Sequence, residues 1–123
     1  MSAENMRQTF ETYLQAWSPI SDGERHRLLD ASVSEGVTYS DAGAQLSGRS
    51  NLGTHLAGFQ QRRAGFSFTL DKFIDHHDVA LANWVMRDPN GAVVVRGYDM
   101  LHFDPAGHVS SITGFSDAPA KPN

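Results

Sequence analysis

The chain of 123 residues contains no cysteine, which excludes a disulfide framework, a thiolate metal site and a cysteine nucleophile. No segment is rich in Lys and Arg, and the net charge is -4, so the sequence predicts no nucleic-acid partner. No apolar run approaches the roughly 18 residues of a membrane span, and residues 1–6 lack the basic and apolar regions of a signal peptide. We therefore expect a cytoplasmic protein without membrane contact.

Metal and cofactor motifs are also missing. The sequence has no HExxH, GxGxxG, P-loop or nucleophile elbow. His76 and His77 are adjacent, and adjacent residues at a strand end point to opposite faces, so they make a poor chelate. We predict no metal site and no cofactor.

The length is that of one ordinary domain, and 40% hydrophobic with 20% charged residues argues against disorder. We predict a single domain over residues 1–117 and a flexible tail over residues 118–123. Apolar residues at helical spacing predict helices over residues 3–17, 22–32 and 49–62. Pro19 ends the first helix, and Ser21 with Glu24 forms a capping box for the second.

Alternating residues predict strands over residues 37–41, 66–76, 79–88, 92–103 and 108–117, with the glycines of 43–48 in a loop. The sequences DPNG at 88–91 and DPAG at 104–107 are typical of hairpin turns, with Gly where φ must be positive. This order predicts an α+β domain in which three helices cover one face of a strongly curved antiparallel sheet. Such an arrangement leaves an interior apolar cavity, a usual place for a small ligand.

Asp99 lies on the apolar face of the strand over 92–103, where it is predicted to be buried. A buried carboxyl is costly when ionised, so its pKa should rise. A raised pKa suits a general acid or a hydrogen-bond donor. The alternative is a structural Asp bonded to a backbone NH, an Arg or a Tyr.

Asp41 and Tyr13 are two further candidates for chemistry. Asp41 ends the first strand and could abstract a proton at the mouth of the pocket, or it could cap NH groups of the following loop. Tyr13 lies on the buried stripe of the first helix. It could donate a hydrogen bond to a developing oxyanion, or it could be a core tyrosine with its tip in water.

Other side chains could form the wall of the pocket or simply fill the core: Trp17, Tyr39, Phe59, Trp84, Leu101 and Ile112. His55 is a further candidate for the pocket, where it could carry a proton, or it could be a satisfied or exposed histidine. The face of Trp84 depends on the hairpin register. A three-residue loop would put Asn83 on the face of Asp99, whereas one bulge would put Trp84 and Met86 there.

Five segments carry a family resemblance: residues 13–17 (YLQAW), 37–41 (VTYSD), 47–50 (SGRS), 97–109 (GYDMLHFDPAGHV) and 114–115 (GF). Through them residues 4–117 resemble the NTF2-like superfamily, and within it the SnoaL-like polyketide cyclases and the ketosteroid isomerases. The resemblance implies a cone-shaped, cystatin-like half-barrel. It also implies a homodimer through the convex sheet face, where Val94, Tyr98, Met100 and Phe115 predict an apolar patch.

For ketosteroid isomerases, the resemblance implies an oxyanion donor at Tyr13, a base at Asp41 and a protonated Asp at Asp99. SnoaL-type cyclases and limonene-type epoxide hydrolases carry a working Asp on the last strand, where this chain has Gly114, so both activities are disfavoured. We predict a cofactor-independent acid/base enzyme for a small hydrophobic carbonyl or polycyclic substrate, of isomerase, cyclase or dehydratase type. The alternative is a non-catalytic small-molecule-binding or dimerisation domain of the same superfamily.

Overall fold

The computed structural model describes residues 3–117, and the predicted flexible tail at 118–123 lies outside them. The described helices are α1 (Ala3–Gln15), α2 (Asp22–Ser32) and α3 (Arg49–Arg62). The described strands are β1 (Val33–Asp41), β2 (Ala44–Ser47), β3 (Ser67–His76), β4 (Val79–Arg87), β5 (Val93–Phe103) and β6 (Val109–Ser116). None of these helices is long and apolar enough to cross a bilayer.

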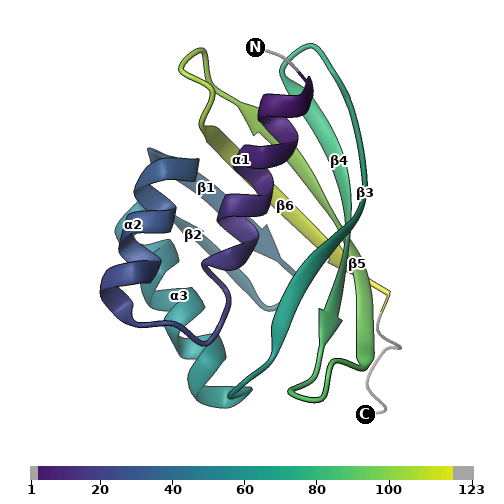
Figure 1. The fold of residues 1–123 in the computed structure, drawn as a ribbon. Coiled ribbons are helices and arrows are strands. Elements are labelled where there is room, and N and C mark those ends of the chain that lie inside the picture. Colours follow the sequence, from purple (N-terminus) through teal and green to yellow (C-terminus); the bar gives the residue numbers. More distant parts are fainter. Residues whose placement is uncertain (1–2, 118–123) are drawn as a thin grey trace.

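The six strands form one sheet in the order β2-β1-β6-β5-β4-β3. Figure 1 shows this sheet curving around the helices, which cover its concave face. The strands β2 and β3 are the two edges, so the sheet is not closed. The predicted α+β architecture of three helices on a curved sheet is confirmed.

The direction of one strand pair differs from the prediction. β1 runs parallel to β6, so the sheet is mixed rather than antiparallel. A parallel pair needs a long crossover, and here α3 and the strands β3 to β5 provide it. The segment predicted as a loop after Asp41 also contains β2, which pairs with β1 through a hairpin that places Asp41 opposite Ala44.

The turn between α1 and α2 is held by a buried arginine. α1 ends at Gln15, two residues earlier than predicted, which leaves carbonyl groups without helical partners. Arg25 is 4% exposed and donates hydrogen bonds to the carbonyl oxygens of Ala16, Ser18 and Ile20. Its charge pairs with Asp22 at 2.9 Å. These contacts set the end of α1 against the start of α2.

The register of the hairpin formed by β4 and β5 decides which side chains face the helices. The ladder shifts by one residue between Met86 and Arg87. As a result Trp84 lies opposite Gly97, two residues from Asp99, so that Trp84 and Asp99 share the concave face. The bulged register is therefore the one that the protein adopts.

Candidate active site

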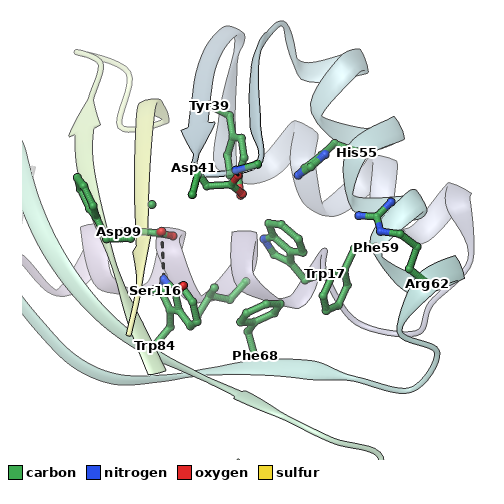
Figure 2. Close-up of a pocket in the computed structure, with 15 residues that line it drawn as sticks. Trp17, Tyr39, Asp41, His55, Phe59, Arg62, Phe68, Trp84, Asp99 and Ser116 are labelled. Carbon is green, nitrogen blue, oxygen red and sulfur yellow. Dashed lines mark hydrogen bonds between the residues drawn. The ribbon is translucent and has the colours of Figure 1, made fainter. Parts of the chain in front are cut away.

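A cavity of about 360 Å³ opens between the concave face of the sheet and the helices α1 and α3. This volume falls in the range of roughly 300–1,000 Å³ that is usual for ligand pockets. Figure 2 shows aromatic rings around it, and the aromatic residues of the wall include Trp17, Tyr39, Phe59, Phe68 and Trp84. The polar wall includes Asp41, Asp99, His55 and Arg62. An apolar cavity with a few polar groups is typical of a small-molecule site.

The aromatic side of the wall is organised around Trp17. Its ring meets the ring of Phe59 edge-on at 5.2 Å and that of Phe68 at 5.0 Å between centroids. Phe68 in turn meets Trp84 edge-on at 5.2 Å. Edge-to-face contacts of this kind favour particular relative orientations of the rings. The rings of the wall therefore support one another.

Two carboxyl groups lie on either side of a glycine on adjacent strands. Asp99 of β5 pairs with Gly114 of β6, and the pairing of Ser40 with Thr113 places Asp41 beside the same glycine. A Cβ atom added to Gly114 would lie 3.0 Å from Oδ1 of Asp99 and 3.6 Å from Cβ of Asp41. Because Gly114 has no side chain, the carboxyl group of Asp99 has room beside it.

Asp99 is buried, at 6% exposed, yet it lines the cavity. The indole Nε1–H of Trp84 donates a hydrogen bond of 3.1 Å to Oδ1, drawn as a dashed line in Figure 2. Burial raises the pKa of Asp99 to about 7; the Trp84 bond opposes this rise, and the nearby Asp41 charge adds to it. A large fraction of Asp99 is therefore protonated at neutral pH and can donate a hydrogen bond.

Asp41 ends β1 at the other side of the glycine. The hydroxyl of Tyr39 donates to its Oδ2 at 2.5 Å, and the backbone N–H of Gly43 donates to its Oδ1 at 2.8 Å. Burial, together with the adjacent Asp41, raises the pKa of Tyr39, so Tyr39 keeps its proton and remains a donor. Asp41 both caps the β1–β2 turn and lines the cavity.

One face of α3 supplies the remaining polar groups. His55, Phe59 and Arg62 are spaced by four and three residues, so they point the same way. The ring of His55 lies 5.2 Å from that of Tyr39, and burial lowers its pKa, so it is mainly neutral at pH 7. Arg62 was not predicted as a site residue, although its spacing of seven residues from His55 indicates that both lie on the same face of α3.

Three predicted site residues lie outside the cavity wall. Tyr13, Leu101 and Ile112 are all buried, but they belong to the core beside the cavity. The Tyr13 hydroxyl has no hydrogen-bond partner among the described residues. Burial and the charge of Asp99 raise the pKa of Tyr13 well above its usual range, although the neighbouring Trp17 side chain opposes the rise.

The structure thus brings Asp41 and Asp99 together in one cavity with four of the predicted wall aromatics and His55. Phe68, Arg62 and the role of Gly114 in this cavity were not predicted from the sequence. Within residues 3–117, no group of three or more His, Cys, Asp or Glu side chains is placed to hold a metal ion.

Comparison with known proteins identifies the family. The profile of the SnoaL-like domain matches residues 10–112, so the chain belongs to the SnoaL-like family. A search of curated proteins found no match.

Solved structures show the same fold. A candidate isomerase of the SnoaL-like family from Agrobacterium tumefaciens has a TM-score of 0.86 at 23% identity, with 94% of this chain and 99% of that chain covered. A candidate SnoaL-like polyketide cyclase from Jannaschia sp. CCS1 has a TM-score of 0.74 at 12% identity, with 94% and 87% covered. A candidate ketosteroid isomerase from Kribbella flavida has a TM-score of 0.69 at 17% identity, with 98% and 84% covered. At these identities the likeness shows the NTF2-like, cystatin-like fold alone.

Proposed function

We propose that this protein is a cofactor-independent acid–base enzyme that moves a proton on a small hydrophobic carbonyl compound. The observation that carries the proposal is the pair of carboxyl groups in one aromatic cavity with different surroundings. Asp41 accepts two hydrogen bonds, whereas Asp99 is buried with its pKa raised to about 7. Two carboxyls in unlike environments suit a base and an acid, respectively.

In this proposal Asp41 removes a proton from the carbon next to the carbonyl group. The electrons of the C–H bond move to the carbonyl oxygen, and the resulting enolate oxygen accepts a hydrogen bond from protonated Asp99. Trp84 holds Oδ1 of that carboxyl, and Oδ2 has no hydrogen-bond partner among the described residues, so Oδ2 is the oxygen free to donate. In a β,γ-unsaturated ketone the enolate is conjugated with the C=C bond, so Asp41 can return the proton to the γ-carbon while the double bond moves next to the carbonyl group, which completes an isomerisation. The apolar wall strengthens these interactions by lowering the local dielectric.

The convex face of the sheet supports a second part of the proposal, pairing of two copies. Ile74, Leu81 and Met100 lie in one row across β3, β4 and β5, and each is 37% exposed or more. Phe115 on β6 is 58% exposed. An apolar patch of this kind favours a partner surface, and we propose a homodimer through it.

The activity is tested with a bicyclic β,γ-unsaturated ketone in deuterated buffer at pH 7. Proton NMR measures deuterium uptake next to the carbonyl, and ultraviolet absorbance measures the conjugated product. We expect Asp41→Asn to lower the rate by about 10²–10⁴-fold, the usual contribution of a general base. Asp117→Asn, at an exposed position outside the cavity, is the control for lost charge and should keep the rate.

A wild-type protein that binds this ketone but exchanges no proton would overturn the enzyme proposal. That result would favour a non-catalytic binding domain instead. Trp17 and Trp84 are the two tryptophans of the chain, and both line the cavity, so quenching of intrinsic fluorescence measures binding separately from turnover.

A further inference from the structure

One cation of the cavity wall, Arg62, forms no ion pair with a described acidic side chain. Arg62 is the single Arg or Lys among the described lining residues. It forms no hydrogen bond or ion pair with another described residue, whereas Arg7, Arg25, Arg27, Arg49 and Arg96 all have acidic partners. Two further arginines without an acidic partner have other contacts: Arg63 lies over the Phe66 ring, and Arg87 donates to oxygens of Thr69 and Gly91. An exposed arginine without a partner at a pocket mouth is available to a ligand.

The guanidinium of Arg62 lies against its own helix. A Cβ atom added to Gly58, one turn earlier on α3, would lie 3.2 Å from Nη1 of Arg62. Figure 2 shows the Arg62 side chain near His55, on the side of the cavity remote from Asp99. The cavity therefore has carboxyl groups at one side and a positive charge at the other.

A position near the end of α3 does not by itself direct an arginine into the cavity, as the neighbouring residue shows. Arg63 is adjacent and also charged, yet it lies over the ring of Phe66 at 5.5 Å and does not line the cavity. A cation in the last turn of a helix can stabilise the helix without entering a neighbouring cavity. Only Arg62 is directed along the face of His55 and Phe59, into the site.

We propose that Arg62 selects substrates that carry a carboxylate in addition to the reacting carbonyl group. The guanidinium fork matches a carboxylate in a bidentate manner. A single cation balances a single negative charge, which favours a carboxylate over a phosphate dianion. The anionic end lies at Arg62, because beside Asp41 it would meet a like charge. The ligand is thus an apolar keto acid with its two polar ends separated by a hydrocarbon body.

This proposal rests on the proposed function for the identity of the carbonyl end, so its test uses binding rather than turnover. The probes are 3-(2-oxocyclohexyl)propanoate and its methyl ester, which differ in charge and share the ketone. Tryptophan fluorescence at pH 7.5 and low salt measures both affinities. We expect the wild type to bind the acid about tenfold more tightly than the ester. We expect Arg62→Gln to lose most of that difference while the ester affinity stays within about twofold.

Arg63→Gln is the matched control, because it removes the same charge one residue away, and it should keep the preference for the acid. Equal wild-type affinities for acid and ester would overturn the proposal. So would an Arg62→Gln variant that weakens both probes equally, or an Arg63→Gln variant that loses the preference as fully as Arg62→Gln does. If the wild type prefers the acid but exchanges no proton, the enzyme proposal fails and the anion site stands. If it exchanges protons on neutral ketones without preferring the acid, the anion site alone fails.

Discussion

Replacing Asp99 by Asn should make the protein less sensitive to pH. Asn keeps the shape of the side chain and an oxygen that can accept the Trp84 hydrogen bond, but it carries no charge at any pH. In the folded wild type, burial raises the pKa of Asp99 from 3.8 to about 7. The unfolded chain therefore releases this proton above about pH 4, whereas the folded protein keeps it until about pH 7.

The size and the sign of the effect follow from that difference. Between pH 4 and pH 7 the folded state holds more protons than the unfolded state, so the free energy of unfolding falls as pH rises. This group contributes a loss of about 1.4 kcal/mol per pH unit, which reaches about 4 kcal/mol and then levels off above pH 7. The Asp99→Asn variant has no carboxyl group at this position, so its free energy of unfolding does not fall for this reason. Its free energy of unfolding, relative to wild type, should rise by about 4 kcal/mol between pH 4 and pH 8.

Urea unfolding at half-unit pH intervals, followed by circular dichroism, measures this difference. Groups that titrate alike in both proteins cancel, because only the difference between wild type and variant is used. Asp117→Asn removes the same charge at an exposed position and is measured in parallel. A difference that stays constant from pH 4 to pH 8, or that rises no more than in Asp117→Asn, would refute the assignment of Asp99 as a buried acid that keeps its proton.

Three further predictions concern packing, hydrogen bonding and assembly. Tyr13→Phe removes a buried hydroxyl without a partner and should raise the free energy of unfolding by about 1 kcal/mol with turnover unchanged; a hundredfold loss of turnover would instead support the donor role that the resemblance implies. Gly97→Ala would place a Cβ against the Trp84 ring and a backbone carbonyl, so urea unfolding should show a loss of about 3 kcal/mol, and full stability would contradict the close approach. Met100→Glu, on the convex face, should yield monomers in sedimentation runs where the wild type is dimeric, and a wild type that is monomeric at micromolar concentration would remove the dimer proposal.

The elements with strong periodicity could be predicted from the sequence. The helical stripe of α1, the Ser21 cap of α2 and the alternation in β5 are local patterns, and each appears close to its predicted place. Only half of the predicted capping box forms, because the Glu24 carboxylate pairs with Arg27 and not with the cap. β2 was missed because Ala44–Ser47 is short and lies between glycines, so it reads as a loop. The parallel pairing of β1 with β6 joins segments about seventy residues apart, and no local pattern encodes it.

The candidate site shows the same division between local and distant information. Asp99 on the apolar face of its strand indicates a buried carboxyl from the sequence alone. The face of Trp84 could not be decided, because one bulged residue reverses it. Nothing in the sequence distinguishes Arg62 from an ordinary solvent-exposed arginine at a helix end. Its role depends on the neighbouring cavity, which only the structure shows. Tyr13 lies on the predicted buried stripe, but which buried side chains reach the cavity depends on how the helix packs on the sheet.

The glycine at position 114 changes how related proteins should be compared. The carboxyl of Asp99 lies 3.0 Å from where a side chain on the last strand would begin, so it reaches the space above β6 from the neighbouring strand. The resemblance implies that some relatives carry an Asp at this position of the last strand. An alignment with such a relative would show only Gly114 there, whereas the structure shows a carboxyl group beside that position, supplied by the neighbouring strand.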